Sequence, residues 1–286
     1  MARPRRPSPA TRLEWCAVTV RPDTLWEKTV DEGQQRLNRG LLALCASGVV
    51  AGLDVGVGIL AADHVTGALT KAVGADLAHE AGALFFGIGF VFIAIGGSEL
   101  FTENFLVPVS TLVAGRASAG QLARLWGVVM LFNLLGLLIV GYLLFGTGML
   151  KEPAELAAGV GSDTYSTRAL GPSLASGFMA GAVVTLWTWL DLATDSSTAR
   201  IALALITGFV LTIASLNHTI VAFGQLTFGM WAGTAHTTVW QVIENTALAL
   251  VANVLGGLAF VTITRLIQAR GEPGEGDSAG RHGAEG

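Results

Sequence analysis

GGSELFTENF, residues 96–105, is a polar, acidic and glycine-led stretch in the middle of an apolar run over residues 80–114. A straight helix over the whole run would be about 52 Å long at ~1.5 Å per residue, well beyond the ~30 Å hydrocarbon core of a bilayer. Because lipid cannot satisfy free backbone groups, such an interruption is tolerated at membrane depth only where it is buried in protein or lines a wet cavity. The stretch therefore predicts a broken helix that lines a pathway.

The composition indicates an integral membrane protein with several passages. Of the 286 residues, 52% are hydrophobic and 13% are charged, whereas soluble domains have roughly 25% charged residues. Six apolar segments are long enough to cross a bilayer, and two of them are too long for one straight crossing. They are residues 41–62, 80–114, 122–148, 169–191, 199–232 and 242–267.

The distribution of Lys and Arg predicts that both termini lie in the cytoplasm. Of the 17 such residues, 14 fall in the N-terminal tail, the second and fourth loops and the C-terminus, and three fall on the other side, Lys71, Lys151 and Arg168. Cytoplasmic loops carry the excess of positive residues. The polar start of the chain lacks a short apolar core with a cleavage site, so we expect the first span to be retained. The expected location is the inner (plasma) membrane.

The chain divides into four predicted regions. Residues 1–22 are rich in Pro and Arg and are predicted to be a disordered cytoplasmic tail. Residues 23–39 have the pattern of an amphipathic helix on the membrane surface. Residues 40–268 form the six-helix membrane channel domain, and residues 269–286, which are Gly-rich and charged, are predicted to be a second disordered cytoplasmic tail.

A short internal repeat relates the two halves of the membrane domain. NLLG at residues 133–136 recurs as NVLG at residues 253–256. Chance recurrence in an apolar chain is the alternative, but each half also contains an overlong segment with a polar interruption, at 96–104 and 215–219. We expect a three-plus-three duplication with the copies in opposite orientation, because each copy has an odd number of passages. Paired interruptions of this kind point to a central permeation site.

GSELFT at residues 97–102 and SLNHTIVAF at residues 215–223, with the duplicated three-helix layout, resemble the formate/nitrite transporter family over about residues 23–268. The resemblance implies an all-α, aquaporin-like protomer with six passages and two broken helices, assembled as a homopentamer in which each protomer has its own pore. It also implies two apolar constrictions of that pore. The residues at these positions are Phe86, Phe90, Leu211 and Val184.

The central pore implied by the resemblance contains His218, Thr102 and Asn217. Without the resemblance, His218 fits a buried structural histidine bonded to backbone. With it, the histidine can donate a proton to a weak acid, because its charge changes easily around neutral pH. Thr102 would present a hydroxyl from the other broken helix, and the N-termini of the half-helices would add positive potential at the same point.

The loop of the first broken helix comprises Gly97, Glu99, Glu103 and Asn104. Acidic residues inside a membrane are costly unless their carboxylates are satisfied. We expect Glu99 to hold the loop by accepting backbone N–H bonds. For Glu103, bracing of the loop and a contribution to selectivity are equally consistent with the sequence.

Several positions depart from the family pattern. Asn217 stands where a Glu usually precedes the pore histidine, and Ala222 and Gly181 stand where the family usually has Asn. No lysine lies near Tyr165, before the fourth span, and Arg168 is the nearest cation. These differences leave the identity of the solute open.

We expect a channel or transporter for small monovalent weak-acid anions, similar to formate or nitrite, with protonation assisted by His218. The alternative is a pore of the same fold for another small solute, neutral or cationic, because the vestibule lysine is missing and Glu103 is added. A membrane enzyme that uses Glu99, Glu103 and His218 ranks last, since no catalytic motif is recognised. No metal-ligand spacing, phosphate motif or nucleic-acid patch is visible, so we expect no cofactor, metal or nucleic acid. The expected partners are the solute, the lipid bilayer and other copies of the chain.

Overall fold

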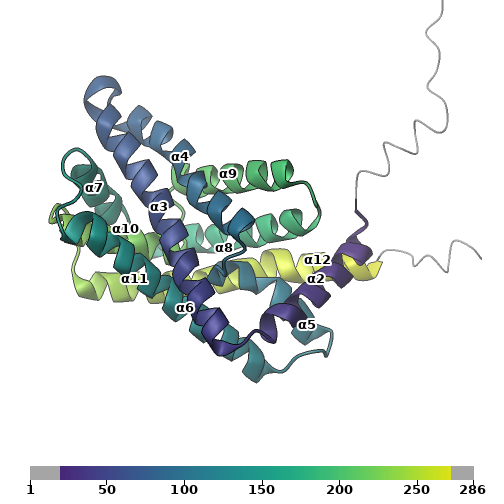
Figure 1. Ribbon diagram of the computed structural model, residues 1–286. Coiled ribbons are helices and arrows are strands. Elements are labelled where there is room, and N and C mark those ends of the chain that lie inside the picture. Colours follow the sequence, from purple (N-terminus) through teal and green to yellow (C-terminus); the bar gives the residue numbers. More distant parts are fainter. Residues whose placement is uncertain (1–19, 272–286) are drawn as a thin grey trace, which may run out of the picture.

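The computed structural model describes residues 20–271, so the predicted tails at 1–19 and 272–286 lie outside the described residues. Within the described range the chain is built from helices and connecting loops, without strands (Figure 1). Its elements in order are α2 (Pro22–Leu37), α3 (Leu41–Val73), α4 (Ala75–Gly96), η1 (Phe101–Phe105), α5 (Val107–Val113), α6 (Ala119–Gly141), η2 (Tyr142–Gly146), α7 (Ala154–Ser166), α8 (Leu170–Leu192), α9 (Ser197–Ile213), α10 (Thr219–Ala232), α11 (Val239–Leu255), η3 (Gly256–Thr262) and α12 (Ile263–Gly271).

Within residues 20–271, five helices are long and apolar enough to cross a membrane. They are Leu41–Val73, Ala75–Gly96, Ala119–Gly146, Leu170–Leu192 and Val239–Gly271. Two shorter apolar helices, α9 and α10, follow each other in the second half of the chain. These lengths agree with the predicted integral membrane protein.

Two predicted boundaries differ from the structure. The first apolar segment was expected to end at residue 62, but α3 continues to Val73, because residues 63–73 contain no proline and the helix ends only before Gly74, whose φ is +87°. At the other end, α12 runs to Gly271, three residues past the predicted end of the membrane domain. The extension of α3 places polar residues of the expected loop on a helix.

The chain leaves the helical conformation at both predicted interruptions. In the first half α4 ends at Gly96, Gly97 adopts a left-handed conformation with φ +69°, and η1 begins at Phe101. In the second half α9 ends at Ile213, and Ser215 has φ +44° before α10 begins. A positive φ is uncommon for a residue other than glycine, so the second break is held by its surroundings.

The amide side chain of Asn133 on α6 holds the first break. Its Oδ1 accepts a hydrogen bond from the backbone N–H of Phe101 at 2.8 Å. Its Nδ2 donates to the carbonyl oxygens of Gly48 and Glu99, both at 2.9 Å. Asn133 is fully buried, so these bonds satisfy backbone groups that water cannot reach.

Asn253 on α11 does the same for the second break. Its Oδ1 accepts from the backbone N–H of Thr219 at 2.8 Å. Its Nδ2 donates to the carbonyl oxygens of Gly177 at 2.8 Å and Asn217 at 2.9 Å. The repeated NxLG sequence thus corresponds to a repeated hydrogen-bond arrangement.

Two glycines let the helices of each half approach closely enough for these bonds. A Cβ atom on Gly52 of α3 would collide with the carbonyl oxygen of Asn133, and one on Gly181 of α8 would collide with that of Asn253. The glycine at position 181, which departs from the family pattern, is therefore required by the packing of α8 against α11 in this chain.

The remaining helices cover the two ends of the molecule. At one end α2 lies beside α5 and α12, and Thr111 donates a hydrogen bond to the carbonyl oxygen of Val30 at 2.8 Å (Figure 1). At the other end, the segment expected as the longest external loop forms α7, which packs against α10 and α3. The two described ends of the chain therefore lie on the same side of the fold (Figure 1).

Candidate functional site

His218 and Thr102 meet where the two broken helices approach each other. His218 Nε2 lies 2.6 Å from Thr102 Oγ1, and both residues are 0% exposed. His218 is the N-cap of α10, and Thr102 lies in η1 just after the first break. Thr102 was expected to present its hydroxyl in the central pore, and in the structure this hydroxyl forms a direct hydrogen bond with His218. A solute that passes this point must replace that bond.

The second ring nitrogen of His218 determines which atom is the donor. His218 Nδ1 accepts a hydrogen bond from the backbone N–H of Val221 at 3.2 Å. A backbone amide can only donate, so Nδ1 has no hydrogen and the neutral ring carries its hydrogen on Nε2. Thr102 Oγ1 then accepts from Nε2. In the described chain Oγ1 has no other hydrogen-bond partner, so the Thr102 hydroxyl hydrogen is left to donate to a third group.

An aromatic ring of α4, that of Phe90, lies beside His218 of this pair. The centroid of the Phe90 ring lies 6.4 Å from that of His218, 5.0 Å from Trp187 and 5.7 Å from Phe86. Phe86 and Phe90 are one helical turn apart and are both fully buried. The structure therefore places Phe90 beside His218 and Phe86 beside Phe90, one helical turn further along α4.

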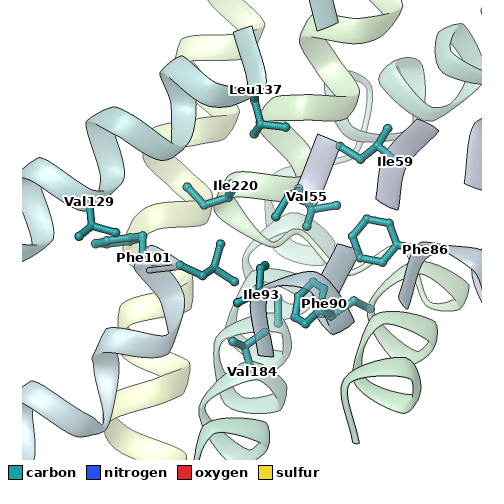
Figure 2. Packing of buried hydrophobic residues seen from close by; sticks show 14 of the residues in the cluster. Val55, Ile59, Phe86, Phe90, Ile93, Phe101, Val129, Leu137, Val184 and Ile220 are labelled. Atoms are coloured by element: carbon teal, nitrogen blue, oxygen red, sulfur yellow. The ribbon is translucent and has the colours of Figure 1, made fainter. Parts of the chain in front are cut away.

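Val184 and Leu211 complete the predicted constriction residues, and both are buried in the same apolar cluster as Phe86 and Phe90. Figure 2 shows Val184 of α8 beside Phe90 and Ile93 of α4. These four residues from α4, α8 and α9 belong to one buried apolar cluster, which reaches His218 through Phe90, and we call them the apolar layer.

Asn217 does not join this pair, contrary to the expectation from its position. Its Nδ2 donates to Ser173 Oγ at 2.8 Å and to Asn245 Oδ1 at 2.9 Å. Asn245 Nδ2 returns a hydrogen bond to Asn217 Oδ1 at 3.0 Å. The Asn217 side chain is therefore directed toward α8 and α11, where it braces the break.

Glu99 holds the first break, but its carboxylate pairs mainly with arginines and not with backbone N–H groups as expected. Glu99 is 2% exposed, and Arg39 Nη1 donates to its Oε1 at 2.7 Å. Arg36 Nη1 lies 3.5 Å from Oε2, and Asn104 Nδ2 donates to the same oxygen at 3.3 Å. The backbone N–H of Glu99 itself donates to Ser47 Oγ at 2.9 Å.

A cavity of about 130 Å³ lies beneath α2, and charged residues line it. Glu103 Oε2 faces it 3.6 Å from Arg36 Nη1, so Glu103 contributes to an ion-pair network with α2. Arg200 pairs with Asp191 at 2.8 Å on the same lining. We call this the arginine cavity.

A second cavity of about 570 Å³ lies between α3, α4, α7, α9 and α10, at the end of the molecule opposite α2. Its charged lining residues are Asp63, Lys71, Asp76 and Glu80, and we call it the acidic cavity. Ser215 of the second break also lines it. Along α4, Phe86 and Phe90 lie between the acidic cavity at residues 75–80 and the arginine cavity at residues 93–97.

Sequence reasoning missed Asp63, which was expected in a loop. In the structure Asp63 lies on α3, is 5% exposed and accepts a hydrogen bond from Gln225 Nε2 of α10 at 3.2 Å. The signal that could have found it is an acidic residue directly after an apolar span, with no proline in the following residues to end the helix.

Arg168, the cation nearest to the missing vestibule lysine, is tied to the second break. Its Nη1 donates to Ser176 Oγ and to the carbonyl oxygen of Ser215, both at 2.8 Å. Its guanidinium lies 5.4 Å from the centre of the Tyr165 ring. Burial raises the pKa of Tyr165 to about 12, so the hydroxyl stays protonated at physiological pH. No ion pair with an acid is formed by Arg168 in the described chain.

Comparison with protein families places residues 23–267 in a model described as "Formate/nitrite transporter". The uncharacterized transporter YrhG of Bacillus subtilis is 27% identical over 86% of this chain and 92% of its own length. The inner membrane protein YfdC of Escherichia coli is 25% identical over 84% of this chain and 76% of its own length. The formate channel BtFdhC of Bacillus thuringiensis is 23% identical, with 84% and 92% covered.

Solved structures with the same fold include one described as an FNT family ion channel. It has a TM-score of 0.75, 20% sequence identity, and coverage of 85% of this chain and 98% of its own. Another, described as a pentameric formate channel with formate bound, has a TM-score of 0.67, 20% identity, and coverage of 79% and 96%. YrhG, BtFdhC and both solved structures are described as transporters or channels, in agreement with the prediction that this chain is not an enzyme.

Proposed function

Because the chain belongs to the formate/nitrite transporter family, we propose that it carries small monovalent weak-acid anions, such as formate, across the membrane. The observation on which the proposal depends is that His218 Nε2 and the Thr102 hydroxyl can both act as hydrogen-bond donors. Nδ1 of His218 is occupied by the N–H of Val221, so the ring can offer a solute only its Nε2 hydrogen, and the Thr102 hydroxyl hydrogen, which has no partner in the described chain, can be donated beside it. Two convergent donors suit an anion and disfavour a cation.

The apolar layer around this pair favours passage of the solute in neutral form. An unpaired anion is far more costly to bury among Phe86, Phe90 and Leu211 than a neutral polar molecule. We propose that the anion is protonated before it crosses and that the acid releases its proton on the far side. His218 assists by donating its Nε2 hydrogen bond to the solute in place of Thr102.

The neutral ring of His218 is not itself the source of the transferred proton. Loss of the Nε2 hydrogen would leave an imidazolate, and a hydrogen on Nδ1 would remove the bond from Val221 that caps α10. His218 therefore orients and stabilises the solute, while the net proton comes from solvent or from another acid on the pathway.

We also propose that the domain crosses the inner membrane six times as an inverted three-plus-three repeat, with both termini in the cytoplasm, and assembles as a homopentamer. The paired breaks, with their matching hydrogen bonds from Asn133 and Asn253, support the repeat. The excess of Lys and Arg on one side supports the orientation, and the pentameric formate channel among the structural neighbours supports the assembly.

A pore for a small cation or neutral solute is the second candidate. The acidic cavity favours it, since three carboxyl groups, those of Asp63, Asp76 and Glu80, line it against one lysine, Lys71. Under this alternative the cavity would select the solute, and the His218–Thr102 pair would be a barrier and not a binding site.

Flux into proteoliposomes separates the two candidates. A panel of formate, nitrite, acetate, water and small cations, with and without a pH gradient, is measured on the full chain. We expect uptake of formate to increase when the outside is acidified, because the neutral acid forms from the anion at low pH. His218→Phe should abolish this pH-dependent uptake and leave the assembled oligomer intact.

His218→Asn is the matched control for the cap. Asn can accept the N–H of Val221 and preserve the start of α10, but it has no imidazole to reach Thr102. We expect it to assemble like the wild-type protein and to lose pH-dependent uptake. Undiminished uptake in both variants would contradict the role of His218, and a wild-type protein that conducts no monovalent anion between about pH 5 and 8 would favour the second candidate.

A further inference from the structure

Two buried side-chain oxygen atoms at the acidic cavity lack a hydrogen-bond donor. Gln225 Nε2 donates to Asp63 Oδ1 at 3.2 Å, but neither Asp63 Oδ2 nor Gln225 Oε1 has a hydrogen-bond partner in the described chain. The two residues are 5% and 8% exposed and lie 162 positions apart, on α3 and α10. Buried polar atoms are nearly always hydrogen-bonded, so this pair of exceptions requires an explanation.

An ionised Asp63 would lack any compensating charge. No Lys, Arg or His in the described chain forms an ion pair with it. The charged and titratable groups that face the cavity are Lys71 on α3, Asp76, His79 and Glu80 on α4, and the protonated Tyr165 on α7, whereas α10 contributes only Gln225. A buried carboxylate without a paired cation is strongly unfavourable.

A single proton on Asp63 Oδ2 would give both Asp63 Oδ2 and Gln225 Oε1 a hydrogen-bond partner. If Asp63 is the neutral acid, its Oδ2–H donates to Gln225 Oε1 while Gln225 Nε2 donates to Asp63 Oδ1, and the acid and amide groups are joined by two hydrogen bonds. We propose that Asp63, held in this way by Gln225, is the proton-loading site from which the solute takes its proton before it enters the apolar layer. This role rests on the proposed transport of weak acids.

The transfer is balanced and needs no further reactant. The O–H bond on Asp63 breaks and a new O–H bond forms on the solute, so the neutral acid and the Asp63 carboxylate replace the anion and the Asp63 acid. The carboxylate is then reprotonated from water in the cavity. For transport in the opposite direction, the carboxylate accepts the proton of the emerging acid.

The place of Asp63 suits this role. It lines the cavity that also reaches Ser215, three residues before the His218 ring in the chain. Asp76 and Glu80, by contrast, are exposed, unlike the buried carboxyl group of Asp63. A neutral Asp63 does not repel an approaching anion. It can also supply the proton, which His218 cannot do while its Nδ1 accepts the hydrogen bond from Val221.

Infrared spectroscopy of the reconstituted full chain tests the acid–amide pair without relying on transport. We expect a carboxylic-acid C=O band at neutral pH that is lost in Asp63→Asn and retained in Asp76→Asn. Gln225→Leu should shift the band to higher frequency, because it removes both hydrogen bonds. Absence of the band in the wild-type protein would mean that Asp63 is ionised, as for a bound cation, and would overturn the inference.

Flux then tests the role. Asp63→Asn is nearly isosteric and should assemble normally, and we expect its pH-driven formate uptake to fall about a hundredfold, the scale of a lost proton donor. Asp76→Asn, with the same chemical change on the exposed wall of the cavity, should keep uptake within about twofold, as expected for an exposed group that transfers no proton. Unchanged uptake in Asp63→Asn would overturn the role even if the band is present. If the wild-type protein carries no weak acid while the band is present, the proposed function fails and the acid–amide pair stands.

Discussion

Asn133 and Asn253, 120 residues apart, hold the two helix breaks with the same three hydrogen bonds. Each amide accepts from one backbone N–H just after a break and donates to two carbonyl oxygens, one in the break and one on a neighbouring helix. Irregular backbone inside a membrane domain is stable only if such groups are satisfied by protein. Each helix break is therefore stabilised by the side chain of one of these two asparagines.

Replacement of Asn253 should destabilise the second break. Asn253→Ala leaves the N–H of Thr219 and the carbonyl oxygens of Gly177 and Asn217 without their partner in a buried site, at a cost of about 1–3 kcal/mol for each group that stays unsatisfied. We expect a lower thermal unfolding midpoint of the purified protein in detergent. Asn38→Ala, at the exposed end of α2, is the control, and equal midpoints for the two variants would refute the assignment.

Close contact between α8 and α11 should make position 181 intolerant of a larger residue. A methyl group on Gly181 would collide with the backbone of Asn253, so Gly181→Ala must push the helices apart, and overpacking of this kind costs about 1–3 kcal/mol. Gly171→Ala, on the same helix, meets no atom within 4 Å and should be neutral. Detergent thermal stability and the yield of folded oligomer compare the two.

Glu99, the buried acid of the first break, should contribute more to the free energy of unfolding than Asp31, an acid in a surface ion pair. Glu99→Gln weakens contacts to Arg39 and Arg36, and we expect a loss of about 2 kcal/mol, less than for a fully buried pair because Arg39 is 37% exposed. Asp31→Asn removes an exposed pair with Arg116 and should cost less than about 1 kcal/mol. A larger loss of unfolding free energy for Asp31→Asn would contradict this ranking.

The hydroxyl of Thr102 should be required for flux and dispensable for folding. Thr102→Val keeps the shape of the side chain but removes the donor, and loss of a hydrogen bond to the neutral solute predicts a decrease of about twofold to tenfold in formate uptake. Thr102→Ser retains the hydroxyl and should retain most of the uptake. If the Val variant conducts as fast as the wild-type protein, Thr102 does not touch the solute.

Much of this architecture is predictable from the sequence because the responsible signals are local. Apolar runs too long for one crossing, with Gly97 in one interruption and His218 in the other, predict broken helices in a membrane protein. The repeated NxLG sequence predicts that the halves are related. The motifs at residues 97–102 and 215–223, together with this duplicated layout, indicate the family to which the chain belongs.

The tertiary structure alone decides how the site works. Adjacency in the chain places Asn217 beside His218, yet packing against α8 and α11 turns the Asn217 side chain away, and the N–H of Val221 determines which nitrogen of His218 faces Thr102. Asp63 meets Gln225 only because α3 continues as a helix and packs near α10. Hydrophobicity and helix breaking depend on neighbours in the sequence, whereas hydrogen-bond partners and burial depend on residues that the fold brings together from far apart.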